Sequence, residues 1–476
     1  MSGIFGVVSQ GNCMETLFYG TDYHSHLGTE YGGIAVLGDS FFRQIHNISQ
    51  SQFKSKFFED FLKANGNKGI GVISDAEEQP IYLNSKFGPF CIVTNGYINN
   101  AEELARKLMT QGYSFSEVSH STVNETELIA KLIGLGENLV DGIDRMFDMI
   151  DGSCSLLLLN REGIYAARDR LGYTPLTVGQ REDGFAVTSE SSAFPNNDFE
   201  IIKSIEPGEI ILISETGISH QKPPRGIKQI CAFLWIYTGF PASCYEGINV
   251  ETVRERCGRF LARKDKDIEV DVVAGVPDSG TAHALGYAME SGKPYRRPLI
   301  KYTPGYGRSY TPPSQEIRDH IAKMKLIPIK NIIEDNRIVI CEDSIVRGTQ
   351  LKNFTVKKLW DCGAKEVHVR PACPPLMFPC KYNLSTRSIH ELAARKAIRS
   401  LEGEDVEDVK EYTVHGTEKY KSMVSWIARD LGVTTLRYQS VDDMVQAIGL
   451  PREKLCLFCW TGECPENTKR ENQEKA

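Results

Sequence analysis

The pattern of apolar and polar positions divides the chain into two parts of different character. Up to about residue 220, short apolar runs bounded by Gly, Asn or Asp predict strands at SGIFGVV, GGIAVL, FCIVTNG, SLLLLN, GFAVTSE and EIILI. Helices are predicted at about 101–111, opened by Asn100, and at about 124–135, where Asn124 and Glu127 have capping-box spacing. This part is therefore predicted to be α+β, with helices packed against sheets.

The pattern changes after a polar segment at 220–229, HQKPPRGIKQ, whose Pro and Gly residues indicate a linker. Three nearly continuous apolar runs follow, separated by helical stretches: EVDVVAGVP, RIVICED and EVHVRPA. Strands of this kind are buried on both faces, so the pattern predicts an α/β unit built on a parallel sheet. From about residue 400 the chain is charged and helical up to CLFCWTGECP, and 466–476 is predicted to be a polar tail.

Composition and charge limit the possible classes of function. The 476 residues are 41% hydrophobic and 25% charged, as in a soluble globular protein of about two to four domains. The longest strongly apolar run, at 154–159, is far shorter than the roughly 18 residues of a membrane span, and the N-terminus lacks the features of a secretory signal. The net charge of −7 gives no reason to expect nucleic acid or an anionic membrane as a partner.

The strongest chemical motif is RIVICEDSIVRGTQLKNF at 337–354. An apolar strand runs into two carboxylates, and a polar loop then leads into a helical pattern; these residues are Glu342, Asp343, Ser344, Arg347, Gly348 and Thr349. Backbone N–H groups at the carboxyl end of a parallel strand bind phosphate well. The carboxylates suit ribose hydroxyls or a Mg²⁺ ion bridging a pyrophosphate. An ordinary strand–turn–helix with solvated charges does not account for this combination.

A second strand–turn–helix, VVAGVPDSGTAHALGYA at 272–288, has Asp278 and Ser279 in its turn. Two such turns on neighbouring strands could hold the two ends of one ligand. The polar segment 301–326 between them contains Lys301, Arg308, Lys323 and Lys325. It could close over a pyrophosphate, although by itself it is more typical of a solvated surface loop.

These motifs resemble the phosphoribosylpyrophosphate (PRPP) signature of type I phosphoribosyltransferases. GVPDS, PSQEIRDHIAKMKL and DSIVRGT together are similar to one family, glutamine phosphoribosylpyrophosphate amidotransferase. Five further stretches are similar to the glutaminase domain of that family: SGIFGVV, TNGYINN, RDRLGYTPL, TSESSAF and IEPGEI. The resemblance covers about residues 1–465. It implies an Ntn-hydrolase-like sandwich at 1–220 and a phosphoribosyltransferase domain with a parallel sheet at 230–465.

The implied reaction is attack of ammonia on C1 of PRPP, which gives 5-phosphoribosylamine and pyrophosphate in purine synthesis. The resemblance also implies a cytoplasmic homo-oligomer inhibited by purine nucleotides. It assigns PRPP contacts to Asp278, Ser279, Glu342, Asp343, Ser344, Arg347, Gly348 and Thr349, with Mg²⁺ at Ser279, Glu342 and Asp343. One departure is mild, since the family usually has two aspartates where this chain has Glu342 and Asp343.

The resemblance weakens at the glutaminase residues. The family's nucleophilic N-terminal cysteine is Ser2 here, and a hydroxyl loses its proton far less readily than a thiol with a pKa of about 8.5. The stretch whose arginine binds the carboxylate of glutamine aligns with GVISD at 71–75, and a second arginine-bearing stretch aligns with HLGTE at 26–30. Both lack the arginine.

The remaining glutaminase positions are partly kept. Asn95 and Gly96 match the oxyanion pair, although Asn-Gly is also a strong signal for a simple hairpin turn. Glu125 stands where the family has the aspartate that holds the substrate amine. Together these changes predict a natural loss of glutamine hydrolysis and dependence on ammonia.

Three hypotheses remain open at this point. The first is a PRPP-dependent transferase that uses free or partner-derived ammonia, which the retained transferase motifs favour. The second is a non-catalytic paralogue that binds PRPP or nucleotides and regulates a true amidotransferase. The third is an active serine-type glutaminase, which the missing arginine disfavours. A transferase acting on another amine also remains open.

Thirteen cysteines without an export signal predict reduced thiols, some of them candidate metal ligands. Some family members carry a 4Fe–4S cluster, and the resemblance implies ligands at Cys231, Cys380, Cys456 and Cys459. Zinc could use the same sulfurs, and ordinary thiols are the third possibility. Cys373 and Cys464 are additional thiols. A cluster far from the two turns would have a structural or oxygen-sensing role.

Overall fold

The computed structural model describes residues 2–463 apart from 76, 120–121, 303–325 and 383–387. The chain forms two compact units. The first comprises Met1–Cys231, Ala242–Gly247 and Lys381–Ser385, and the second comprises Ala232–Pro241, Ile248–Cys380 and Thr386–Ala476. Among the described helices, none has the length and apolar character needed to span a membrane.

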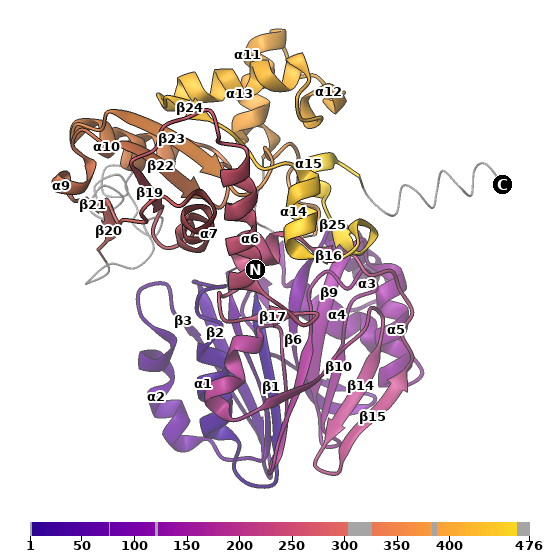
Figure 1. Cartoon of the computed structure of the whole chain (residues 1–476). Coiled ribbons are helices and arrows are strands. Elements are labelled where there is room, and N and C mark those ends of the chain that lie inside the picture. The colour runs from indigo at the N-terminus through magenta and orange to yellow at the C-terminus, as the bar shows by residue number, and fades with distance from the viewer. Residues whose placement is uncertain (1, 76, 120–121, 303–325, 383–387, 464–476) are drawn as a thin grey trace. The chain divides into compact units, whose positions relative to one another are not determined.

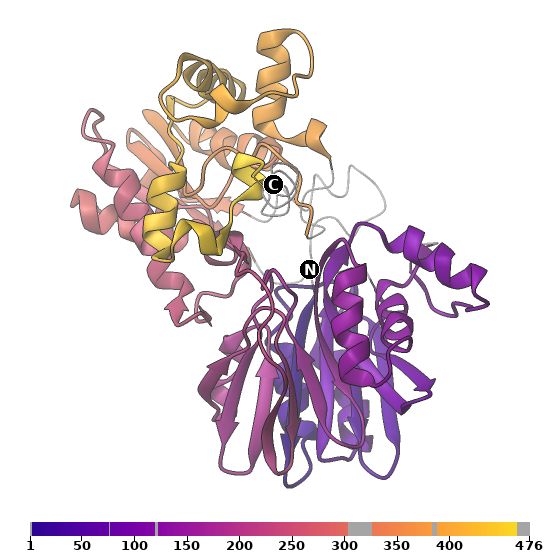
Figure 2. The same cartoon turned by 90° about the vertical axis from the view of Figure 1, so that its right-hand side faces the viewer.

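Two antiparallel sheets form the centre of the first unit (Figures 1 and 2). The larger sheet has, in spatial order, β13 (Glu200–Ser204), β11 (Thr177–Arg181), β12 (Gly184–Thr188), β1 (Gly3–Ser9), β4 (Lys68–Ser74), β2 (Tyr31–Leu37) and β3 (Phe41–Asn47). The smaller sheet has β15 (Gly217–Lys222), β14 (Ile210–Ser214), β10 (Ile164–Ala167), β9 (Gly152–Leu159), β6 (Gly88–Ile98) and β5 (Ile81–Ser85).

The two sheets pack face to face. Apolar side chains from both of them, including Ile4, Val72, Val93 and Leu157, form one buried cluster, which explains why the predicted strands are apolar runs. All six predicted strands of this part are confirmed, as β1, β2, β6, β9, β12 and β14. The predicted linker is correct only in part, because residues 220–222 extend β15 and pair with β14.

Helices cover the outer faces of this sandwich. The larger sheet carries α1 (Met14–Asp22) and α2 (Phe53–Lys63), and the smaller sheet carries α3 (Ala101–Thr110), α4 (Glu125–Ile133) and α5 (Leu139–Met149). The predicted helices correspond to α3 and α4. Asn124 caps α4 by accepting a 3.0 Å hydrogen bond from the Glu127 N–H. The other half of the predicted capping box is wrong, because the Glu127 carboxylate instead accepts hydrogen bonds from the Ser116 and Glu117 N–H groups.

The second unit contains the predicted parallel sheet. Its order is β19 (Val272–Gly275), β22 (Arg337–Glu342), β23 (Glu366–Pro371) and β24 (Thr435–Leu436), and all neighbouring strands are parallel. The first three of these strands lie side by side in Figure 1. The sheet is buried on both faces, as the continuous apolar runs predicted.

One face of this sheet packs against α10 (Lys357–Asp361), α11 (Ala393–Glu402) and α13 (Glu418–Leu431). On the other side, α6 (Val250–Arg263) and α7 (Thr281–Ser291) pack against each other. The predicted helical content after residue 400 is confirmed by α12 (Lys410–Thr413), α13 and α14 (Val441–Ile448), which precede α15 (Phe458–Thr461).

Candidate functional site

The two turns predicted to share a ligand lie at the same edge of the parallel sheet. Gly275 at the end of β19 is in register with Cys341 of β22, and the Val276 N–H donates a 3.0 Å hydrogen bond to the Cys341 carbonyl. Gly280 lies so close to that carbonyl that a Cβ on it would collide with the oxygen. Glycine is therefore required at position 280 for the backbones of the two turns to meet.

Two side chains also join these turns. The Ser279 hydroxyl donates a 2.6 Å hydrogen bond to Glu342, and the Asp343 N–H donates to the same carboxylate oxygen at 3.1 Å. The Ser344 hydroxyl donates to Asp343 at 2.5 Å. Glu342 and Asp343 are both buried, and this burial, followed by the neighbouring charge of Asp343, raises the pKa of Glu342. Two adjacent carboxylates and a hydroxyl form an oxygen-only donor set, as Mg²⁺ requires.

The predicted phosphate-binding loop, residues 343–349 and called the phosphate loop below, continues from this carboxylate pair. Gly348 has a φ of 78°, a left-handed conformation that glycine adopts without strain, and its carbonyl accepts a hydrogen bond from the Lys352 N–H. A π-helical turn, η4 (Leu351–Val356), then leads into α10, as the helical pattern predicted. Arg347 is exposed and donates a 2.7 Å hydrogen bond to Glu391.

Lys301 is the one basic residue of the intervening polar segment that the structure describes. It lies at the end of β20 (Leu299–Lys301), and its ammonium group donates a 2.8 Å hydrogen bond to Asp278 of the first turn. The cation therefore stands beside the predicted PRPP contacts. Arg308, Lys323, Lys325 and most of PSQEIRDHIAKMKL lie outside the described residues.

In the first unit, Ser74, which the resemblance aligns with the family's arginine, contacts Ser2 at the predicted nucleophile position. Ser2 precedes β1, and Ser74 ends the neighbouring strand β4. Their hydroxyl groups are 3.3 Å apart, and Ser74 also accepts a 3.1 Å hydrogen bond from the Glu77 N–H. Asp75, the next residue, accepts a 2.7 Å hydrogen bond from Thr29 of the HLGTE stretch. Short polar side chains thus bond to one another where the resemblance predicts the family's carboxylate clamp.

Two neighbouring carboxyl groups, the buried Glu77 and the partly buried Glu125, extend this network to α4. The sequence analysis did not find them as a pair. Glu77 accepts hydrogen bonds from the N–H groups of Glu125 and Thr126, so it caps the first turn of the helix. Glu125 accepts a 3.2 Å hydrogen bond from the Ile98 N–H. Burial of Glu125, and next the charge of Glu77, raise the pKa of Glu125 to about 8.

A second acidic residue that the sequence analysis missed is Glu190, which is buried and lies 3.5 Å from His26 of the HLGTE stretch. Ser243 donates a 2.7 Å hydrogen bond to Glu190, and the Tyr245 hydroxyl also donates to it. In the sequence, Glu190 stood out only as part of the TSESSAF stretch, which resembles the family. The carboxylate is therefore engaged by three polar side chains within the first unit.

The hairpin interpretation of Asn95 and Gly96 is wrong. Both lie within the long strand β6, where they pair with Ser155 and Cys154 of β9. A Cβ on Gly96 would collide with the Ser153 carbonyl, so the close approach of the two strands requires glycine here. The predicted oxyanion pair is thus held on a rigid sheet element.

The predicted cluster ligands fall in both units. Cys456, Cys459 and Cys380 belong to the second unit, where the Cys459 carbonyl accepts hydrogen bonds from the N–H groups of Met377 and Phe378. Cys231 belongs to the first unit. Within the described residues, no group of three or more His, Cys, Asp or Glu side chains is arranged to hold a metal ion. The cluster therefore stays a prediction, and Cys464 lies outside the described part of the chain.

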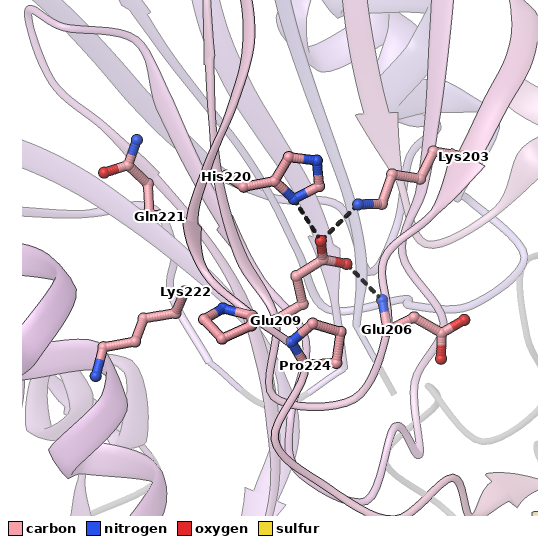
Figure 3. Close-up of a pocket in the computed structure, with 8 residues that line it drawn as sticks. Lys203, Glu206, Glu209, His220, Gln221, Lys222 and Pro224 are labelled. Carbon is pink, nitrogen blue, oxygen red and sulfur yellow. Dashed lines mark hydrogen bonds and ion pairs between the residues drawn. The ribbon is translucent and has the colours of Figure 1, made fainter.

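A pocket of about 440 Å³ in the first unit is lined in part by the IEPGEI stretch and by none of the predicted site residues (Figure 3). At its centre the buried Glu209 carboxylate accepts hydrogen bonds from Lys203, His220 and the Glu206 N–H, at 2.5, 2.9 and 2.9 Å. Because these charged groups satisfy one another, the pocket offers no uncompensated charge for a ligand.

The Glu77–Glu125 pair generates a prediction about pH. The folded protein keeps a proton on Glu125 up to a pH of about 8, whereas the unfolded chain releases it near the ordinary pKa of about 4.3. The folded state therefore loses stability as the pH rises from about 4.3 to 8. Glu125→Gln cannot ionise, so it should unfold at a higher temperature than the wild type at pH 8–9 and show a flatter pH profile.

Thermal unfolding between pH 5 and 9 measures this difference, with Glu102→Gln, an exposed carboxylate on α3, as the matched control. Wild-type and Glu125→Gln profiles that run in parallel over this range would show that Glu125 is not protonated in the folded protein.

Comparison with known proteins gives the family to which these two units belong. A glutamine amidotransferase domain model matches residues 68–196. The chain is 33% identical to the amidophosphoribosyltransferase of Methanocaldococcus jannaschii, with 98% of each chain covered, and 34% identical to that of Pyrococcus horikoshii, with 98% of this chain and 96% of the relative covered.

A solved structure extends this similarity to the whole architecture. Glutamine PRPP amidotransferase from Bacillus subtilis, complexed with ADP and GMP, superposes with a TM-score of 0.84 at 30% identity and covers 97% of each chain. The Ntn-hydrolase-like sandwich and the phosphoribosyltransferase-like parallel sheet are thus found together in one relative. The relatives are more than 30% identical over nearly their full length, and the two turns adjoin at the edge of the parallel sheet. The chain therefore belongs to the amidophosphoribosyltransferase family.

Proposed function

We propose that this protein transfers ammonia to C1 of PRPP and releases 5-phosphoribosylamine and pyrophosphate. The observation that carries the proposal is the junction of the two turns, where the Ser279 hydroxyl bonds to Glu342 at 2.6 Å. The nitrogen–C1 bond forms as the bond from C1 to the pyrophosphate oxygen breaks, so the charge that develops lies on the leaving group. In this proposal residues 230–465 form the transferase domain.

The residues at the junction have distinct proposed roles. Glu342, Asp343 and Ser279 would hold Mg²⁺, which neutralises the pyrophosphate as it leaves. Ser344, Gly348 and Thr349 would bind the 5-phosphate through hydroxyl and backbone N–H groups, with Arg347 supplying charge. Asp278 would lie at the pyrophosphate end, where its pairing with Lys301 offsets its negative charge.

Asp343→Asn should lower turnover of PRPP with ammonium by about 100-fold or more, because it removes one of two adjacent metal-binding carboxylates. The measurement is pyrophosphate release with saturating Mg²⁺, together with calorimetric PRPP binding. Asp361→Asn, an exposed carboxylate on α10, is the control and should behave as the wild type. Unchanged PRPP affinity in both Asp343→Asn and Thr349→Val would place the site elsewhere.

We further propose that the glutaminase domain, residues 1–220, has lost glutamine hydrolysis. Support comes from the Ser74 side chain, which contacts Ser2 at the point where the family has the arginine that clamps the carboxylate of glutamine. Asp75 beside it would repel that carboxylate. A cation that clamps a carboxylate cannot be replaced by hydroxyl groups without a large loss of binding. Ammonia itself is then the nitrogen donor.

Glutamine should therefore give no 5-phosphoribosylamine, whereas ammonium chloride at pH 8–9, where free ammonia is appreciable, should. The measurement compares the two donors at equal concentration with PRPP and Mg²⁺. Ser2→Cys alone should not restore use of glutamine, because the missing arginine is unchanged. Glutamine-dependent turnover in the native protein would refute the loss. Absence of turnover with either donor would instead favour a regulatory paralogue.

Purine nucleotides are proposed as inhibitors, because the Bacillus subtilis relative was solved with ADP and GMP. A cytoplasmic homo-oligomer remains the expectation from the family. These two properties do not affect the assignment of the transferase chemistry.

We also propose a 4Fe–4S cluster on Cys231, Cys380, Cys456 and Cys459. Support comes from the backbone bonds of Cys459 to Met377 and Phe378, which bring the C-terminal C-x-x-C segment next to the chain that leads to Cys380. Such a cluster supplies four thiolate bonds that tie distant segments together, so it would contribute to folding.

Anaerobically purified protein should then contain about four iron and four sulfide per chain. Cys456→Ser should lose the iron, and Cys13→Ser, a buried cysteine of the first unit, should keep it. Elemental analysis distinguishes the alternatives: zinc in place of iron would keep the ligands and refute the cluster, and absence of any metal would refute both.

A further inference from the structure

The second unit contains a buried guanidinium group that forms no ion pair with any residue that the structure describes. Arg395 lies in the first turn of α11 and is only 6% exposed. Its Nη2 donates a 2.9 Å hydrogen bond to the Val406 carbonyl. Within the described part of the chain, its Nε and Nη1 groups have no hydrogen-bond partner and are shielded from water. Burial of an uncompensated guanidinium is costly, so its presence requires an explanation.

Asp405, the carboxylate whose charge attracts Arg395, forms no hydrogen bond or ion pair with it among the described contacts. Asp405 accepts a 3.0 Å hydrogen bond from Arg399 and lies 3.2 Å from His390. It is therefore shared between two other basic side chains. Burial, and then the neighbouring Arg399, lower the pKa of Arg395 against the attraction of Asp405. Among the described residues, Arg395 therefore has no carboxylate paired with it.

The start of α11 adds a second feature that attracts an anion. The helix has ten residues, and its N-cap residue, Leu392, provides no side-chain cap. The N-terminal end of a helix carries partial positive charge, and side chains in the first turn lean toward that end. Its first N–H group, from Ala393, donates a 2.7 Å hydrogen bond to the Val346 carbonyl in the phosphate loop. The region around Arg395 is thus joined directly to that loop.

We propose that Arg395 and the N-terminal turn of α11 form a binding site for a small oxyanion, either a phosphate group or a carboxylate. The turn at 403–408, which covers the guanidinium, is largely exposed, so its displacement would admit the anion. The oxyanion would accept hydrogen bonds from Nε and Nη1 of Arg395 and neutralise the buried charge. Through Ala393 and Val346, its binding would steady the phosphate loop. The site is separate from the predicted PRPP contacts and goes beyond the proposed reaction.

The test uses the full-length protein in a chloride buffer free of phosphate and sulfate. Inorganic phosphate, sulfate and acetate are each titrated while thermal unfolding is followed, and calorimetry gives the number of phosphate ions bound. The wild type should gain about 3 °C in Tm with saturating anion. A response to phosphate and sulfate identifies a phosphate site, and a response to acetate alone identifies a carboxylate site.

Arg395→Met keeps the volume of the side chain and removes the buried charge, so it should be at least as stable as the wild type without anion and should show a smaller rise in Tm, because one of two bound anions is lost. Arg106→Met, an exposed helical arginine in the first unit, should keep the full rise. If Arg395→Met does not fold, Arg395→Lys serves instead and should show a weakened response. No response in the wild type, or an undiminished response in the Arg395 variant, overturns the proposal.

Phosphate also competes for the predicted PRPP site, so Thr349→Val is included. Wild-type protein should bind two phosphate ions, and the Arg395 and Thr349 variants should each lose a different one. If only the Arg395 variant loses an ion, the anion site stands and the proposed PRPP site fails. If only the Thr349 variant does, the anion site fails.

Discussion

The close contact between the turn after β19 and the Cys341 carbonyl is the constraint on which the second unit depends. Only a residue without a Cβ fits at position 280, and the parallel register of β19 and β22 fixes which residues stand at the edge of the sheet. Ser279 and Glu342 meet because of that register. The carboxylate pair, the phosphate loop and the start of α11 then follow along the same edge, each joined to the next by a hydrogen bond.

The two units differ in the polar groups that they could offer to a ligand. In the second unit, the carboxylates and hydroxyls gather at the end of two strands, where substrate oxygens and a metal ion can reach them. In the first unit, Ser2, Ser74, Glu77 and Glu125 are connected in a network of their own. Both sets have internal hydrogen-bond partners, but they differ in chemistry: the oxygen donors of the second unit suit Mg²⁺ and ribose hydroxyls, whereas none of the four first-unit residues supplies the cation that a glutamine carboxylate needs. This difference is the physical reason for proposing that PRPP chemistry persists where glutamine chemistry does not.

Much of the fold could be predicted because burial imposes a pattern on local sequence. Short apolar runs bounded by Gly, Asn or Asp predicted the strands of the sandwich, and nearly continuous apolar runs such as RIVICED predicted the parallel strands. Contacts between residues far apart in the chain leave no comparable pattern in the local sequence. Nothing local to Glu77 indicates that it caps α4, which begins 48 residues later, and Asn95–Gly96 has the sequence of a turn although β9 holds it in a strand. Likewise, the local sequence does not show that Asp405 bonds to Arg399 and lies beside His390, with no ion pair to Arg395 among the described residues.

The central claim is that one site of this chain is kept and the other is lost, and calorimetry on the native protein tests it most directly. The protein is titrated with PRPP and Mg²⁺ in one experiment and with L-glutamine in another, under the same conditions. The account predicts saturable binding of one PRPP per chain and no detectable binding of glutamine. Saturable glutamine binding, or failure to bind PRPP, would contradict it.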